Sequence, residues 1–199
     1  MRALHTQLLL DSYKVATGAY SVGLSLGGRP VAASDPASAD FDAWQFVCGQ
    51  GPSLDAQRTG RSVVVCDTTT GVDQWTLLNE AHGTWPAAGL LAVPIGSGAA
   101  VGALTLHRQT AGALSPSQHE TARTCADHAA AWLVASLDPM SPVDMGHFDL
   151  IGRATGIVMA QTGLESDDAT AIIRAHAYSG HLELAAVLDD IIGLRLTLV

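Results

Sequence analysis

Two prolines within four residues, Pro139 and Pro142, separate two stretches of different apolar periodicity. A proline inside a helix removes a backbone hydrogen bond and clashes with the preceding turn, so we expect no regular helix to cross this segment. Before it, helical and alternating patterns are mixed, and after it only helical patterns occur. The sequence therefore predicts a domain over residues 1–138, a linker over 139–146 and a helical domain over 147–199.

Composition excludes a disordered chain and argues against a general polyanion binder. Of 199 residues, 48% are hydrophobic and 15% are charged, which is typical of folded domains with real cores. Ten basic residues face 19 acidic ones, a net charge of -9, whereas nucleic-acid affinity rests on Lys and Arg. Three widely spaced cysteines, the lack of an export signal and the lack of a long apolar stretch predict a cytoplasmic protein without a membrane span.

The first part of the chain predicts a sheet with helices packed on it. Helical spacing of apolar residues near the N-terminus is followed by strict alternation from Tyr20 to Leu26, which indicates a half-buried strand. Further strands are expected at residues 63–66, 90–95 and 101–107, and the short glycine-bearing connection between the last two suits a hairpin. The predicted fold class is α+β, an antiparallel sheet with flanking helices followed by a small three-helix bundle.

The clearest helix signal in this part begins at Ser115. Pro116 suits the first helical position, and Gln118 completes an S-x-x-Q capping box. By contrast, residues 32–89 look irregular apart from one short strand, and they contain three of the four tryptophans. Long connections in compact domains are often binding loops, although tryptophans that simply cover the sheet are an equal alternative.

An ordered series of motifs in this first part resembles the GAF domains of actinobacterial regulators. The motifs are Phe41–Gln45, Gly49–Ala56, Gly60–Val65, Asp67, Trp75, Ala92–Ile95 and Gly102–Leu104. The resemblance implies a sensory or dimerising module whose pocket lies between the sheet and the variable loops. Many such relatives have a cysteine where this chain has Ser53, so a thiol role at that position is absent.

The resemblance leaves the ligand and any cofactor unknown. We expect aromatic and apolar side chains to line the pocket, which favours a flat or apolar small molecule because aromatic faces give large contact area with little polar demand. The candidate ligand-binding residues are Trp44, Phe46, Cys48, Trp75 and Trp85.

The second part predicts three short amphipathic helices. The first should end near Gly163, the second should begin with Ser166 as its N-cap, and the third should break near Gly193. Such a bundle buries little apolar surface, so we expect it to be marginal alone and to be helped by dimerisation.

This second part resembles an ANTAR domain, the RNA-binding output module of transcription antiterminators. The matching residues are Ala154–Met159, Gly163, Asp168–Ala169, Ile173–Arg174, Ala177, Leu182, Leu184–Ala185 and Ile191–Ile192. The resemblance implies a signal-responsive regulator in which the GAF part senses and the ANTAR part, as a homodimer, binds RNA hairpins.

Two departures from the family pattern bear on RNA binding. The family has a lysine where this chain has Thr155, and residues 146–199 hold three basic and seven acidic residues. Arg153 and Arg174 are the predicted RNA contacts because a guanidinium can pair with phosphate or stack on a base. Thr155 is a weaker polar contact, and His176 or His181 would add charge below neutral pH.

Two alternatives stay open. One is a divergent GAF and ANTAR protein that acts through small-molecule or protein binding without recognising RNA. The other is a GAF-fold reductase of free methionine sulfoxide, which requires Cys48 and Cys66 to meet as nucleophile and resolving thiol. Neither the cysteines nor the eight histidines show metal-ligand spacing, so no catalytic residue and no metal site are predicted.

Overall fold

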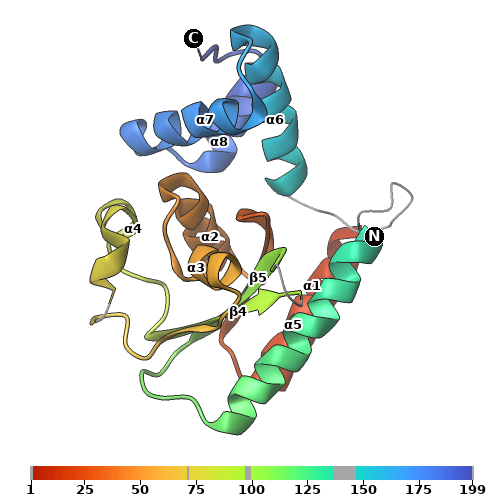
Figure 1. The fold of residues 1–199 in the computed structure, drawn as a ribbon, viewed down its shortest axis with the longest axis vertical. Helices are drawn as coiled ribbons and strands as arrows, with labels where there is room; N and C mark the ends of the chain where they lie inside the picture. The colour runs from red at the N-terminus through yellow and green to blue at the C-terminus, as the bar shows by residue number, and fades with distance from the viewer. Residues whose placement is uncertain (1, 71, 97–99, 137–146, 199) are drawn as a thin grey trace.

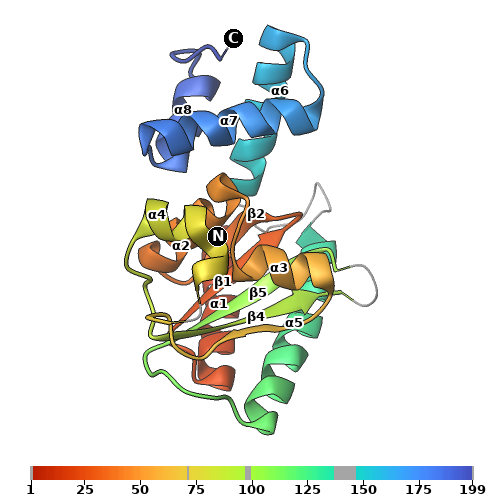
Figure 2. The ribbon, with the colours of Figure 1, turned by 60° about the vertical axis from the view of Figure 1, so that its left-hand side comes forward.

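The computed structural model describes residues 2–70, 72–96, 100–136 and 147–198. A five-stranded antiparallel sheet has helices on both faces, and a three-helix bundle lies against the helical layer on one of them (Figures 1 and 2). The predicted fold class is therefore confirmed. Among the described residues, no helix is both long and apolar enough to cross a membrane.

The sheet has the strand order β2-β1-β5-β4-β3. Its strands are β1 (Ser21–Leu26), β2 (Arg29–Ala33), β3 (Val63–Val65), β4 (Gly89–Ile95) and β5 (Gly102–Arg108). Strands β4 and β5 pair antiparallel, which confirms the predicted hairpin, although residues 97–99 of its connection lie outside the described residues.

Helices precede, interrupt and follow this sheet. They are α1 (Arg2–Thr17), α2 (Pro36–Cys48), α3 (Pro52–Thr59), the 3-10 turn η1 (Asp73–Trp75), α4 (Thr76–His82), α5 (Pro116–Ser136), α6 (His147–Thr162), α7 (Ser166–Gly180) and α8 (Leu184–Ile192). The proposed linker over 139–146 lies outside the described residues.

The prediction of an irregular segment over residues 32–89 is wrong. The segment contains α2, α3 and α4 beside β3. Helix α2 starts after Asp35, whose side chain accepts hydrogen bonds from two backbone N–H groups, and it ends at Gly49 with φ 66°. Proline at the first turn and glycine after the last are standard helix boundaries, and the same pair, Pro52 and Gly60, encloses α3.

The predicted capping box at the start of α5 is confirmed. The Ser115 N–H donates to the Gln118 side-chain oxygen over 2.8 Å, and the Gln118 N–H donates to the Ser115 hydroxyl over 3.2 Å. Two backbone donors that have no partner within the helix are thereby satisfied.

The two faces of the sheet differ in chemistry. The face under α1 and α5 is apolar and includes the buried side chains of Val22, Leu24, Leu104 and Leu106. Residues alternate between faces along a strand, so the face under α2–α4 receives the residues between these. Its buried polar residues are Ser21, Ser25, Thr105 and His107.

The helices of the bundle begin and end close to the residues that the sequence predicts. The Gly163 N–H donates to the Met159 carbonyl, with φ 73° at Gly163, so this glycine terminates α6. The expected N-cap of α7 is off by one residue, because Glu165 occupies the cap and Ser166 is the first helical residue. Glu165 makes no side-chain cap, so the start of α7 depends on packing rather than on capping.

The bundle does not bury its apolar face alone. One continuous cluster of buried side chains joins Ile151, Ile173 and Leu188 of the bundle to Phe46 and Val47 of α2. Helices α7 and α8 contact α2, and α6 contacts β2. The N-terminal domain therefore supplies the apolar partner that a small bundle needs.

Leu104→Ala should destabilise the N-terminal domain by about 3 kcal/mol. Leu104 is fully buried in the central strand β5, so truncation loses transfer free energy and leaves a cavity. Urea unfolding measures the change. Leu8→Ala is the control, since Leu8 is 59% exposed, and an equal loss in both variants would contradict this account of the core.

Candidate functional site

Helix α2 lies between the sheet and the bundle and directs buried side chains toward both. Nine of its residues are buried, because the sheet lies on one side of the helix and the bundle lies on the other. Side chains directed to the sheet therefore form a candidate sensor site. Side chains and carbonyl groups directed to the bundle form the junction between the two domains.

A buried polar network lies between α2 and the sheet. The Gln45 amide donates to one carboxylate oxygen of Asp42 over 2.8 Å, and its own oxygen accepts from the N–H and the hydroxyl of Ser53, each over 2.9 Å. The other Asp42 oxygen has no hydrogen-bond partner and lies directly over Gly23 of β1. Burial raises the pKa of Asp42 to about 7, against the lowering effect of the Gln45 hydrogen bond.

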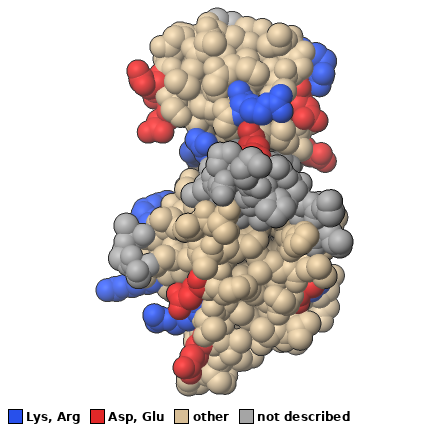
Figure 3. Space-filling view, turned by 90° about the vertical axis from the view of Figure 1, so that its right-hand side faces the viewer, with Lys and Arg blue, Asp and Glu red and all other residues tan. Residues whose placement is uncertain are grey.

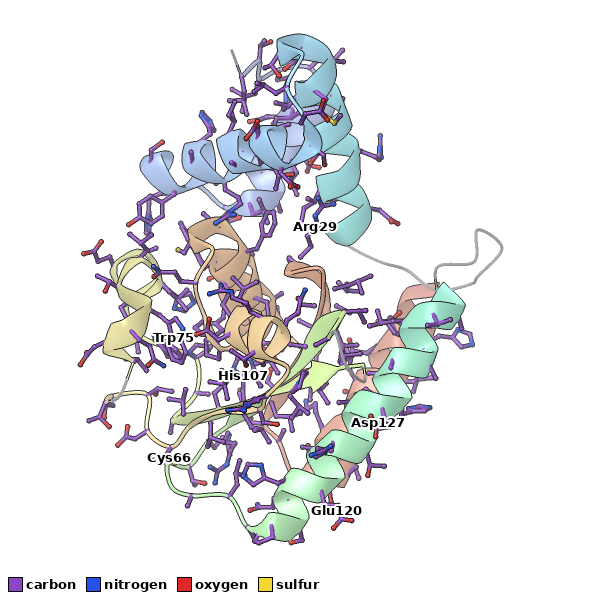
Figure 4. All side chains as sticks on the ribbon, viewed as in Figure 1. Arg29, Cys66, Trp75, His107, Glu120 and Asp127 are labelled. Atoms are coloured by element: carbon purple, nitrogen blue, oxygen red, sulfur yellow. The ribbon has the colours of Figure 1, made fainter. Side chains whose placement is uncertain are left out.

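His107 of β5 lies in the same layer, fully buried. Neither of its ring nitrogens has a hydrogen-bond partner, and burial lowers its pKa to about 4. The Phe41 ring meets it edge-on with centroids 5.6 Å apart. Figure 4 shows His107 and Trp75 on the α2–α4 side of the sheet, opposite to Asp127 on α5.

The structure divides the four tryptophan and phenylalanine residues among the five predicted ligand-binding residues between two places. Trp75 and Trp85 pack together at 5.6 Å beside Phe41, and their indole N–H groups donate to Asp55 and Asn79.

Trp44 and Phe46 lie instead at the junction, where the Trp44 ring is 5.0 Å from that of His181 and Phe46 lines a groove of about 240 Å³ between the domains. The five side chains are all buried. The aromatic set that can line one sensor pocket is therefore smaller than predicted.

The cysteines do not have the chemistry that a thiol reductase needs. Cys48 is buried, its thiol donates weakly to the Leu77 carbonyl over 3.5 Å, and burial raises its pKa to about 11. A thiol held in its protonated form is a poor nucleophile. Cys66 is exposed, and the described residues contain no group of three His, Cys, Asp or Glu side chains that could hold a metal ion.

The three predicted RNA contacts differ in accessibility. Arg153 is exposed on α6. Thr155 is 3% exposed, and its hydroxyl lies 3.2 Å from that of Thr170 on α7, so it stabilises the packing of two helices. Arg174 is half-buried between the domains, where its Nε donates to the Val47 carbonyl over 3.2 Å. Arg153 and Arg174 therefore do not share one exposed face.

Charges on the bundle are mixed rather than gathered. On the face drawn in Figure 3, basic and acidic side chains lie next to one another over the C-terminal part. Arg195, for example, pairs with Asp190 over 2.7 Å. Figure 4 also shows Arg29 of β2 beside α6, at the boundary between the domains.

Sequence reasoning missed Asp42, His107 and Tyr178. A charged residue in a predicted binding motif was the available signal for Asp42, since Asp42 lies within Phe41–Gln45. His107 follows Leu106 in a strand whose alternation places the two side chains on opposite faces of the sheet. The Tyr178 hydroxyl donates to Glu80 of α4 over 3.4 Å, a contact between domains that periodicity cannot indicate.

Asp42→Asn should change how stability depends on pH. A carboxyl whose pKa is raised to about 7 in the folded protein binds a proton that the unfolded chain has lost, so ionised Asp42 destabilises the fold as pH rises. We expect the unfolding free energy of the variant to rise relative to that of the natural protein between about pH 4 and pH 8, by on the order of 4 kcal/mol in all.

Thermal or urea unfolding at each pH measures this difference. The titration of His107 is common to both proteins and cancels. Asp127→Asn is the control because Asp127 is exposed on α5. Parallel pH curves for the Asp42 variant and the natural protein would contradict the assignment of a buried, partly unpaired carboxyl.

Two of the comparisons with known proteins found a match. A domain of a two-component sensor histidine kinase protein from Sinorhizobium meliloti 1021 is similar in structure, with a TM-score of 0.42 and 15% identity over 66% of this chain and 89% of the other. A likeness this distant carries no functional assignment. No curated protein matches the chain in sequence.

Residues 145–192 match the family model of the ANTAR domain. The match runs from the start of α6 to the last residue of α8, so it coincides with the bundle. The resemblance drawn from the sequence is thereby confirmed for this segment. The C-terminal three-helix bundle is an ANTAR domain.

Proposed function

We propose that this protein is a signal-responsive regulator of transcription antitermination whose ANTAR domain binds RNA hairpins. The observation that carries the proposal is the family match over residues 145–192, on a segment that folds as the three-helix unit α6–α8. Arg153 and Arg174 are its principal RNA contacts, and Thr155 acts indirectly by holding α6 against α7 through Thr170.

The acidity of the bundle determines what kind of RNA binding to expect. With three basic and seven acidic residues over 146–199, non-specific attraction to phosphate is weak. Affinity then depends on a few arginines and on stacking with unpaired loop bases, which is how proteins commonly recognise single-stranded RNA. A homodimer that presents two such faces raises the affinity for adjacent hairpins.

The N-terminal domain is the sensor in this proposal. Its α2–α4 side combines Trp75 and Trp85, whose rings pack at a tilt of 36°, with two buried groups, Asp42 and His107, that have unpaired polar atoms. This combination supports a small flat ligand with an apolar body and one or two hydrogen-bonding groups.

RNA binding is tested with the full chain and a leader RNA that holds two adjacent hairpins, across a series of salt concentrations. Arg153→Ala should weaken binding several-fold and lower the slope of log affinity against log salt by about one, because one phosphate contact is lost. Arg123→Ala, which removes an exposed arginine of α5, is the control and should change neither quantity.

Binding that is undetectable at every salt concentration, both for the natural protein and for variants in which the contact of Arg174 with α2 is opened, with a known RNA-binding protein active in the same assay, would refute the proposal. The ANTAR domain would then act through protein contacts. Equal losses for the Arg153 and Arg123 variants would instead show that overall charge, rather than the bundle, attracts the RNA.

A further inference from the structure

Three side chains form a stripe that reaches from α7 and its C-cap into the N-terminal domain. Arg174 and Tyr178 are spaced by four residues, which places them on one face of α7, and His181 is the C-cap that follows the helix with a left-handed backbone. The Arg174 guanidinium contacts the last turn of α2, the Tyr178 hydroxyl donates to Glu80 of α4, and the His181 ring packs on Trp44 of α2.

Arg174 fits this junction closely. Its Nε donates to the Val47 carbonyl, and its guanidinium carbon lies 5.8 Å from the centroid of the Phe46 ring. A Cβ atom at position 49 would overlap the guanidinium, so the arginine passes where Gly49 leaves space. Gly49 also has φ 66°, which closes α2 and exposes the carbonyl that Arg174 reaches.

The chemistry of this stripe is that of an RNA-binding face rather than of an ordinary core. An arginine, a tyrosine and a histidine together offer a phosphate partner and two rings on which bases can stack. Core positions of the same helix, Ala169, Ile173 and Ala177, are apolar and face the bundle. RNA and the N-terminal domain would contact the same polar side chains, so they cannot both bind them at once.

We propose that the Arg174–Tyr178–His181 stripe is a second RNA-binding face of the ANTAR domain, in addition to the exposed Arg153, and that the last turn of α2 holds this face closed. This inference rests on the proposed function, because it assigns both the RNA contacts and their regulation. Release of Arg174 from Val47 and Gly49 exposes the stripe, and RNA then competes with the N-terminal domain for the same side chains.

The last turn of α2 is also placed to receive a signal. Helix α2 carries Asp42 and Gln45 toward the sheet, and Gln45 is bonded to Ser53 beyond the turn. On the same loop, the Gln50 side chain accepts from the Leu77 N–H of α4. A ligand that engages the unpaired oxygen of Asp42 thus acts on the helix whose end holds Arg174.

Gly49→Asn in the full chain tests the inference, with Gly18→Asn as the matched control. Asparagine tolerates the left-handed backbone of both glycines, which have φ 66° and 68° and each follow a helix. Only position 49 has Arg174 in the way, since nothing lies within 4 Å of a Cβ at Gly18. Glu80→Ala is a second variant, which removes the acceptor of Tyr178 at an exposed site and so spares the fold.

Two measurements are made on each protein at equal concentration. Hydrogen–deuterium exchange of peptides over residues 44–50 and 172–182 reports opening of the junction, and titration with the two-hairpin leader RNA reports affinity. We expect Gly49→Asn to speed exchange in both peptides and to bind RNA about fivefold more tightly or better, because the competent population rises. Glu80→Ala should shift both quantities in the same direction, and Gly18→Asn should shift neither. Adding Arg174→Ala to Gly49→Asn should abolish the gain in affinity.

Different results would refute closure by α2 and RNA binding by the ANTAR domain. If Gly49→Asn opens the junction but binds RNA with the measurable affinity of the natural protein, closure by α2 is refuted and RNA binding stands. Unchanged exchange in both Gly49→Asn and Glu80→Ala also refutes closure. If no variant binds RNA although the junction opens, the RNA-binding function is refuted, and the assigned face with it.

Discussion

Burial of α2 on two sides is the constraint on which both halves of the molecule depend. Toward the sheet, the helix covers a face that carries Ser21, Ser25, Thr105 and His107 among its buried residues. Toward the bundle, Phe46 and Val47 belong to the same apolar cluster as Ile173 and Leu188. A displacement of α2 therefore changes the packing both against the sheet and at the junction, because close-packed interiors transmit small shifts.

The two faces of the sheet are covered by different kinds of side chain. The α1 and α5 side is closed by apolar packing around Leu24 and Leu104, which stabilises the domain and leaves few polar groups to satisfy. The α2–α4 side holds two groups with unpaired polar atoms, Asp42 and His107, where an orphaned polar atom costs stability. Such a cost is common at sites that interact with ligands, which makes the α2–α4 side the candidate site of the proposed sensor.

Thr155 shows how position in a fold changes the meaning of a motif residue. Its place in the family pattern suggests a polar contact with RNA, yet its hydroxyl is buried against Thr170. The charge that the family lysine would bring is absent, and the hydroxyl instead fixes α6 on α7. In the proposed function, RNA recognition therefore depends on Arg153, which is exposed on α6, and on Arg174 at the junction.

Local signals in the sequence determined most of the elements. The capping box at Ser115, the alternation in β1, the stop at Gly163 and the family motif over the bundle are all encoded within a few residues, so they could be predicted. Helices α2 and α3 also have local boundary signals, Pro in the first turn and Gly after the last residue. The polar residues around them obscure the apolar periodicity that would have indicated helices. Only the tertiary structure decided that Arg174 meets Val47, 127 residues away, and that Asp42 is buried without a full set of partners. Periodicity states which face of a helix is apolar, whereas the partner of that face depends on how separately folded elements pack.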